Sequence, residues 1–256
     1  MIHPTAIVDP GAAIGKDVRI GPYAVIDADV SIGAGTVIGP HAVIGPHVEI
    51  EPDCRISQGS AVGGIPQSVR FEGEVTHVRI GARTVIHEFA TIHRGTGFGG
   101  GVTRIGQDCM LMAYAHVGHD AQIGNHAMLV NNATLAGHAT VGEYAQVGAF
   151  TPVHQFCRIG DHAFIGGCST VTRDVPPYVL AVGNRAVARG LNLVGLKRQG
   201  FSSETVLMLK KAYRLVFRSK LRQADAIRQI LETVDQVPEV VRFIDFIRSS
   251  ERGLAR

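Results

Sequence analysis

The stretch that decides the fold is "AIGKDVRIGPYAVIDADVSIGAGTVIG", residues 13–39, in which an isoleucine returns at every sixth position. The same step continues on both sides. Every sixth residue from Ile2 to Val62 is aliphatic, and so is every sixth residue from Ile80 to Ile92. After a slip of one residue the pattern resumes at Ile105 and runs to Val171. A fixed period of this length indicates a stacked, repetitive architecture.

A period of six predicts a coil made of three short strands. The residue two before each aliphatic is usually small or β-branched, as at Ala12, Val18 and Ala24, which puts both on one face of a strand. Glycine often follows the aliphatic, and we expect these glycines to adopt the positive φ of the corners. Three hexads make an 18-residue triangular coil, and stacked coils form parallel sheets with strands about 4.8 Å apart. We therefore expect an all-β solenoid, a parallel β-helix, over residues 1–175.

Two segments interrupt the repeat. Residues 63–79, "GGIPQSVRFEGEVTHVR", place Ser68 and Glu74 at positions of the pattern that should be buried, so we expect a loop extruded from the prism. Its polar residues Gln67 and Arg70 favour a binding role. The glycine-rich residues 95–103, "GTGFGGGVT", absorb the one-residue slip and fit a tolerated insertion as well as a functional loop.

The pattern changes after residue 175. Residues 176–256 are predicted to be a crossing segment followed by a small α-helical domain. Ser202 is suited to cap a helix, because Val206, Leu209 and Tyr213 follow at helical spacing. A second helix is expected over 222–235, and Pro238 fits the first turn of a third that reaches Ser250.

Composition excludes several classes of protein. No run of 18 apolar residues is present, which argues against a transmembrane segment, and the first ten residues do not resemble a secretory signal. The four cysteines, Cys54, Cys109, Cys157 and Cys168, show no metal-binding spacing. Reduced thiols and a cytoplasmic location are the expectation.

The net charge of +3 hides an asymmetry. Residues 1–172 hold 9 basic and 14 acidic residues, a balance of −5, whereas residues 173–256 hold 16 basic and 8 acidic residues, a balance of +8. A basic C-terminal third predicts an acidic partner, which could be nucleic acid, an anionic membrane surface or an acidic protein. All twelve histidines lie in the acidic part.

An 18-residue coil converts sequence distance into geometry. His119, Gly137 and Gln155 are 18 residues apart and should form one column; Asp120, His138 and Phe156 should form the next. A histidine beside a carboxylate suits general base catalysis. The N–H of a glycine can donate to an oxyanion. The column lacks serine and cysteine, which favours direct attack by a substrate hydroxyl over a covalent intermediate.

Other interpretations of these histidines stay open. His41, His47, His126 and His162 recur at corners without partners and are expected to be surface decoration. The cluster around His119 would also suit a zinc site of the type found in β-helical carbonic anhydrases. A non-catalytic scaffold in which the histidines are simply exposed is a third alternative.

Six motifs stand out along the chain: "TIHRGT" (91–96), "NNATLAGH" (131–138), "VHQFCRIG" (153–160), "GGCS" (166–169), "DVPPYV" (174–179) and "GLKRQGF" (195–201). Together they resemble one enzyme family, the bacterial UDP-N-acetylglucosamine acyltransferases of lipid A biosynthesis. The resemblance covers essentially the whole chain. It implies a left-handed parallel β-helix and a cytoplasmic homotrimer with active sites between neighbouring copies. The implied reaction moves a 3-hydroxyacyl group from acyl carrier protein to the glucosamine 3-hydroxyl of UDP-N-acetylglucosamine.

The resemblance also implies roles for individual residues. His119 would be the general base, Asp120 its orienting partner, and Gly137 the oxyanion donor. Gly167 and Arg185 would set the length of the acyl chain, and the basic C-terminal helices would receive the acidic acyl carrier protein. No cofactor, metal or nucleic acid is implied. The substrate-binding residues would be Gln67, Arg70, His116, His138, His154, Gln155, Asn192 and Arg198.

Three positions depart from the family pattern. Ser68 stands where the family has an aspartate near the acceptor sugar, Gln199 replaces a second arginine, and Val194 replaces a polar residue at the nucleotide. A 3-amino sugar that would give an amide product is therefore an alternative acceptor.

An alternative enzyme is the N-acyltransferase that acts later in the same pathway. That enzyme usually carries an added N-terminal domain, whereas the hexads here begin at Ile2.

Overall fold

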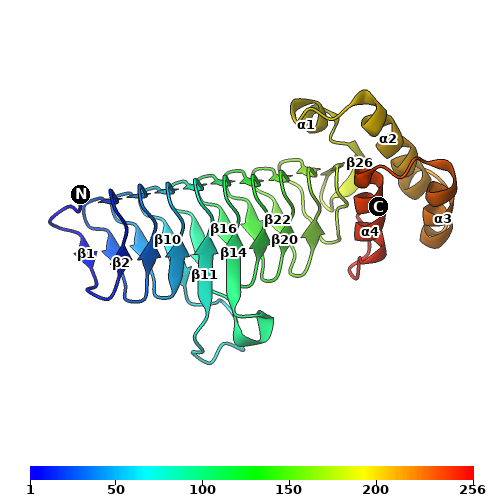
Figure 1. Cartoon of the computed structure of the whole chain (residues 1–256). Coiled ribbons are helices and arrows are strands. Elements are labelled where there is room, and N and C mark those ends of the chain that lie inside the picture. The colour runs from blue at the N-terminus through cyan, green and yellow to red at the C-terminus, as the bar shows by residue number, and fades with distance from the viewer.

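The computed structural model describes all 256 residues. The chain forms a long triangular prism, and a cluster of helices lies at the C-terminal end of this prism (Figure 1). Each turn of the chain contributes one short strand to each of three sheets, and neighbouring strands within the solenoid are parallel. The first sheet contains β1 (Ile7–Val8), β4 (Val25–Ile26), β7 (Val43–Ile44), β10 (Ala61–Gly64), β13 (Thr91–His93), β16 (His116–Val117), β19 (Thr134–Leu135) and β22 (Pro152–Val153).

The other two sheets complete the prism. The second contains β2 (Ala13–Ile14), β5 (Ser31–Ile32), β8 (Val48–Ile50), β11 (His77–Ile80), β14 (Val102–Ile105), β17 (Gln122–Ile123), β20 (Thr140–Val141) and β23 (Arg158–Ile159). The third contains β3 (Arg19–Ile20), β6 (Val37–Ile38), β9 (Arg55–Ile56), β12 (Val85–Ile86), β15 (Met110–Leu111), β18 (Met128–Leu129), β21 (Gln146–Val147), β24 (Phe164–Ile165), β25 (Val179–Val182) and β26 (Val187–Leu191).

The register confirms the 18-residue coil. Val117 pairs with Leu135, and Leu135 pairs with Val153. The coil that contains the glycine-rich segment is longer, because Ile92 pairs with Val117. The columns predicted around His119 therefore exist as predicted.

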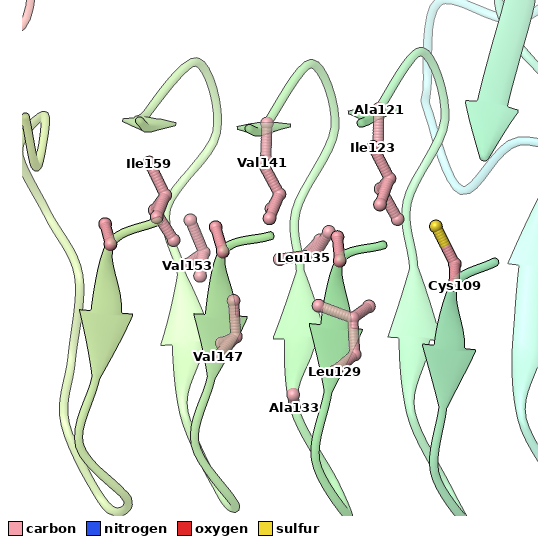
Figure 2. Close-up of a cluster of buried hydrophobic side chains, with 14 of the residues drawn as sticks. Cys109, Ala121, Ile123, Leu129, Ala133, Leu135, Val141, Val147, Val153 and Ile159 are labelled. Carbon is pink, nitrogen blue, oxygen red and sulfur yellow. The ribbon is translucent and has the colours of Figure 1, made fainter. Parts of the chain in front are cut away.

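The core is a ladder of the hexad aliphatics, which point into the prism from all three sheets (Figure 2). Leu129, Leu135 and Val141 are at most 1% exposed, and the small Ala133 is fully buried beside them. Burial of each large aliphatic contributes about 1.5–3 kcal/mol. The ladder makes the wall of the prism rigid, so the side chains at its corners keep fixed positions.

The expectation that glycines supply the positive φ of the corners is wrong. The left-handed residue of most corners is not glycine: φ is 60° at Asp120, 61° at His138 and 63° at Phe156. The glycine after the aliphatic is required for space instead. A Cβ atom at Gly118 would stand 2.7 Å from the carbonyl oxygen of Leu135 in the next coil.

Both interruptions leave the prism at the same corner, which joins the first sheet to the second; we call it the first–second corner. The extruded loop is shorter than predicted, residues 65–76, because residues 63–64 belong to β10 and 77–79 to β11. The glycine-rich segment forms a 3₁₀ turn, η1 (Gly97–Gly99), before β14. The loop 65–76 and the glycine-rich segment lie side by side below the prism (Figure 1).

The crossing segment is more ordered than predicted. It contains β25, which continues the third sheet, the antiparallel β26, and a short helix α1 (Leu193–Arg198). The three predicted helices are confirmed as α2 (Ser203–Phe217), α3 (Gln223–Thr233) and α4 (Pro238–Arg248), with Ser202 accepting a hydrogen bond from Thr205 N–H as the N-cap. None of the helices is long and apolar enough to cross a membrane.

Candidate active site

The first–second corner gathers the polar residues that the sequence singled out. Going along the prism, successive coils place there the loop 65–76, the glycine-rich segment, the pair His119 and Asp120, and then His138. Strand pairs on both sides fix the coils that carry His119, Asp120 and His138, so these three residues are held by rigid elements.

His119 and Asp120 form a hydrogen-bonded pair. The Nδ1 atom of His119 lies 2.8 Å from Oδ2 of Asp120. The Asp120 side chain has no exposed surface, whereas the His119 side chain is 15% exposed. With Nδ1 bonded to the carboxylate, Nε2 of His119 makes no hydrogen bond within the chain and is free to accept a proton.

The carboxylate of Asp120 has partners that the hexad pattern could not indicate. Thr96 donates to it twice, from its backbone N–H to Oδ1 at 2.9 Å and from its hydroxyl to Oδ2 at 2.6 Å. The backbone N–H of Asp120 donates to the Thr103 hydroxyl at 2.8 Å. Thr96 ends the motif "TIHRGT", and this was the only signal in the sequence for its role.

Gly137 lies directly against the imidazole of His119. A Cβ atom at position 137 would stand 2.5 Å from Cε1 of His119. The N–H of Gly137 makes no hydrogen bond within the chain. The absence of a side chain therefore gives room to the histidine ring and leaves a backbone donor unoccupied beside it.

His138 is the second histidine at Asp120. Its Nε2 atom lies 3.8 Å from Oδ2 of Asp120, and its ring stacks on Phe156 with 4.4 Å between centroids. Burial lowers the pKa of His138 below its ordinary value, although the charge of Asp120 opposes this effect. Burial therefore favours the neutral form of His138.

Loop 65–76 reaches the same place through Arg70. Its guanidinium carbon lies 3.9 Å from the centroid of the Phe98 ring, and that ring lies 5.9 Å from His138 and 6.4 Å from His119. Gln67 is exposed on the same loop and makes no hydrogen bond within the chain. The structure thus brings Arg70 to the site and leaves Gln67 free beside it.

His116 lies one strand before the pair, in β16. Its Nδ1 atom lies 2.8 Å from the Thr91 hydroxyl, and its ring packs edge-on against His93 at 5.1 Å. Burial lowers the pKa of His116, and burial together with the neighbouring histidines lowers the pKa of His93 to about 4. Sequence reasoning missed His93, which is a half-buried neighbour of the site whose buried Nδ1 atom has no hydrogen-bond partner.

His154 and Gln155 continue the corner one coil further and are exposed. Nδ1 of His154 lies 2.6 Å from a guanidinium nitrogen of Arg252, near the C-terminal end of the chain. Gln155 makes no hydrogen bond within the chain through its side chain. These two residues border the site without touching His119.

Asn192 and Arg198 lie elsewhere, at the corner that joins the second sheet to the third. They line a cavity of about 570 Å³ with Val194, Gln199 and Tyr144. Asn192 also has a structural role, because its Oδ1 caps α1 at Gly195 N–H and its Nδ2 donates to the His162 carbonyl. Within one chain this cavity is separate from the His119 cluster.

Gly167 and Arg185 occupy the third corner, which joins the third sheet to the first. Gly167 is exposed, and a Cβ atom there would meet only the Ala149 backbone, at 3.4 Å or more. Arg185 follows Asn184, which bridges to Thr170 just beyond that corner. The corners of one prism thus carry the His119 cluster, the Asn192 cavity and Gly167 apart from one another.

A metal ion is the remaining interpretation of the cluster. Ligand atoms of His119, Asp120 and His138 all lie within 4.8 Å of one another. However, the Asp120 oxygens already accept hydrogen bonds from Thr96 and His119. A metal bound to this carboxylate would have to displace donors that are built into the fold, so the donor set does not fit a resident metal.

Comparison with known proteins shows what the chain is similar to. The family model described as "Udp N-acetylglucosamine O-acyltransferase; Domain 2" matches residues 174–255, and the bacterial transferase hexapeptide model matches 29–64 and 103–137. An acyl-(acyl-carrier-protein)–UDP-N-acetylglucosamine O-acyltransferase of Halorhodospira halophila is 49% identical over 255 residues, covering 100% of this chain and 99% of the relative. The corresponding enzyme of a Sulfurihydrogenibium species is 53% identical, covering 99% and 94%.

Solved structures agree with the sequence relatives. The UDP-N-acetylglucosamine acyltransferase of Acinetobacter baumannii superposes with a TM-score of 0.97 at 42% identity, covering 100% of this chain and 99% of that one. The predicted fold, a left-handed parallel β-helix followed by a helical domain, is thereby confirmed. The relatives' names specify O-acylation of UDP-N-acetylglucosamine, which does not favour the 3-amino-sugar, later-pathway or zinc-enzyme alternatives.

Proposed function

Since the chain belongs to the family of acyl-(acyl-carrier-protein)–UDP-N-acetylglucosamine O-acyltransferases, we propose how its corner residues carry out the transfer. The enzyme moves an acyl chain from acyl carrier protein to UDP-N-acetylglucosamine, the first step of lipid A biosynthesis. The observation that carries the proposal is the His119–Asp120 pair, which leaves Nε2 as the free basic atom of the site.

His119 is the general base of the reaction. Its Nε2 accepts the proton of the sugar 3-hydroxyl while that oxygen attacks the carbonyl carbon of the 3-hydroxyacyl thioester. Asp120 stabilises the imidazolium that forms and keeps the proton of Nδ1 in place. When the C–S bond breaks, the imidazolium returns its proton to the leaving thiolate of the carrier protein's prosthetic arm. An ester and a free thiol result, and no covalent enzyme intermediate is needed.

Gly137 stabilises the charge that develops on the thioester oxygen. Its N–H is unoccupied and lies beside the base, so it can donate to the oxyanion of the tetrahedral intermediate. His138 and His116 line the adjacent pocket for the sugar and the acyl chain. His154 and Gln155 extend that pocket by one coil.

The nucleotide contacts require a second copy of the chain. Asn192 and Arg198 lie at a different corner from His119, and a single substrate can contact both sets only across an interface. A homotrimer of parallel prisms satisfies this condition, because each cleft then combines different corners of two copies. Arg198 pairs with the diphosphate, and Arg70 and Gln67 reach over the sugar from the loop.

Acyl carrier protein docks on the helical domain. Lys210, Lys211 and Arg214 are exposed on α2 and have no acidic partner within the chain, so their charge is available to an acidic surface. The acyl chain runs toward Gly167 and Arg185 at the neighbouring corner, where their size sets its accepted length.

The decisive experiment replaces the base. We expect His119→Ala to lower kcat for transfer from 3-hydroxyacyl carrier protein to UDP-N-acetylglucosamine by about 100-fold or more. The unfolding temperature should stay that of the wild type, because the ring is held at the surface of a rigid wall. The matched control is His126→Ala, another corner histidine, which stacks on Tyr144. A variant that keeps more than a tenth of wild-type activity would show that His119 is not the base.

Mixed assemblies test the shared site. His119→Ala and Arg198→Ala, each inactive alone, should regain activity when coexpressed, because some clefts then combine an intact His119 with an intact Arg198. The solution mass of the wild type should be three times 27.3 kDa. Absence of complementation in a mixed trimer would place both residues in a site within one copy.

A further inference from the structure

We propose that Thr96 is a positioning residue for the reaction, and that the glycine-rich segment 95–101 serves to bring it to Asp120. Thr96 donates one hydrogen bond to each oxygen of the Asp120 carboxylate and thereby fixes the orientation of the His119 imidazole. The inference rests on the proposed role of His119 as the general base.

The hydrogen bonds of the carboxylate are few and well defined. Thr96 N–H donates to Oδ1 at 2.9 Å, the Thr96 hydroxyl donates to Oδ2 at 2.6 Å, and Nδ1 of His119 lies 2.8 Å from the same Oδ2. Thr96 is fully buried, and the Asp120 side chain has no exposed surface. A buried carboxylate is stable as an anion only with such donors, so Thr96 supplies two of the three groups on which the charge depends.

Two glycines of the segment are required for space near Asp120. A Cβ atom at Gly99 would stand 2.2 Å from Cγ of Asp120. One at Gly95 would first meet the backbone of Gly101 and Val102, where the segment closes on itself, and would also stand 2.8 Å from Oδ1 of Asp120. Neither glycine has positive φ, so these two positions need space and not an unusual backbone. Gly100 and Gly101, with φ of 101° and 79°, turn the chain back toward β14. The segment is therefore built to close on the carboxylate.

Contacts outside the segment hold it in place. Gly97 N–H donates to Oε1 of Glu74, in loop 65–76, at 2.8 Å. This hydrogen bond lowers the pKa of Glu74, so the loop contributes an anionic acceptor. On the other side, the Thr103 hydroxyl accepts from the backbone N–H of Asp120 at 2.8 Å. Asp120 is thus fixed through both its side chain and its backbone.

The Thr96 hydroxyl determines which of the two histidines is hydrogen-bonded to the Asp120 carboxylate. Nε2 of His138 lies 3.8 Å from Oδ2, the same oxygen that bonds Nδ1 of His119. Besides Glu74, Arg70 also brings a charge near the site, because its guanidinium stacks on Phe98 next to His138. Without the hydroxyl, a small rotation would let Oδ2 turn from His119 to His138. With it, the carboxylate stays on His119 and the proton stays on Nδ1.

The test is Thr96→Val, which keeps the shape and the backbone donor and removes only the hydroxyl. We expect kcat to fall about tenfold or more, as for the loss of a hydrogen bond to a charged group, with KM for UDP-N-acetylglucosamine within about twofold of the wild type. Thr96→Ser, which keeps the hydroxyl, should restore kcat.

The matched control is Thr84→Val. Thr84 is also fully buried, donates to the Gly106 carbonyl at 2.8 Å and accepts from Cys109 N–H at 3.1 Å, but it lies at the second–third corner. We expect wild-type kcat from it. An equal loss in Thr84→Val, or no rescue by Thr96→Ser, would reduce Thr96 to a packing residue and overturn the proposal.

A second pair of variants tests the same proposal if Thr96→Val does not fold. Gly99→Ala keeps the Thr96 hydroxyl but pushes the segment away from Asp120, and it should reproduce the loss of kcat with KM for UDP-N-acetylglucosamine nearly unchanged. Its control is Gly190→Ala, where a Cβ atom meets nothing within 4 Å. If Thr96→Val and Gly99→Ala both behave as the wild type while His119→Ala is inactive, the positioning role is wrong and the general base stands. An active His119→Ala would overturn the general base itself.

Discussion

The imidazole of His119 occupies the space that a side chain at Gly137 would take, since a Cβ atom there would stand 2.5 Å from Cε1 of the ring. We predict that Gly137→Ala lowers kcat about tenfold or more, because the ring must move away from its position beside Asp120. Steady-state kinetics with both substrates measures this effect. If the glycine mattered only for the backbone N–H, Gly137→Ala would keep most of its activity, because alanine retains that donor.

A larger side chain at position 167 should test the acyl-chain length without disturbing the fold. A Cβ atom at Gly167 meets the Ala149 backbone only at van der Waals distance, so Gly167→Met should leave the unfolding temperature unchanged. The longer side chain should occupy the end of the acyl groove, and the variant should prefer shorter acyl chains than the wild type. A panel of acyl carrier proteins loaded with different chain lengths measures the preference. An unchanged preference would remove Gly167 from the acyl groove.

Acidification should destabilise the protein partly through His93. Its pKa is lowered to about 4 in the fold, below the ordinary value of 6.5, so the unfolded chain binds an additional proton between these two values. Stability attributable to His93 is therefore complete above pH 6.5 and is lost as the pH falls toward 4.

Denaturation midpoints of His93→Gln at pH 7 and pH 4.5 test this expectation. The variant should lose less stability over that range than the wild type. The exposed His41, which stacks on Tyr23, provides the control His41→Gln. Burial also lowers the pKa values of His116, His138 and His162, so part of the acid sensitivity should persist. Equal sensitivity of His93→Gln and wild type would contradict the assignment.

The docking of acyl carrier protein on α2 should depend on charge. We predict that the double variant Lys211→Glu, Arg214→Glu raises KM for acyl carrier protein about tenfold and leaves KM for UDP-N-acetylglucosamine unchanged. Added salt should raise KM of the wild type in the same direction. Arg19→Glu, in β3 near the opposite end of the prism (Figure 1), is the control and should behave as the wild type. A similar effect of Arg19→Glu would mean that net charge alone matters.

Much of the fold was predictable because its repeat is strict. The six-residue step from Ile2 to Val62 predicts the three sheets, and the 18-residue coil predicts that His119, Gly137 and Gln155 share a column. The reason is geometric: once the strands pair in register, the relative position of every corner residue follows from counting.

The interrupted parts were less predictable for the same reason. Glu74 was recognised as unsuited to the core, but its partner, Gly97 N–H, lies 23 residues away in another irregular segment. Neither segment follows the six-residue repeat, so their relative positions cannot be obtained by counting residues. The role of the corner glycines was mispredicted because the close approach of Leu135 to Gly118 is a property of stacked coils, which a single hexad does not contain.

The sequence by itself determined the prism, its register and the column that holds His119, because the hexad repeat fixes the position of each corner on a rigid wall. Only the tertiary structure decided which groups complete the site. The donors of Thr96 reach Asp120 across 24 residues of chain, and Asn192 and Arg198 lie at a different corner from His119. These contacts arise from loop closure and from the packing of coils, where hydrogen-bond geometry and available space select the partners and no local pattern records them.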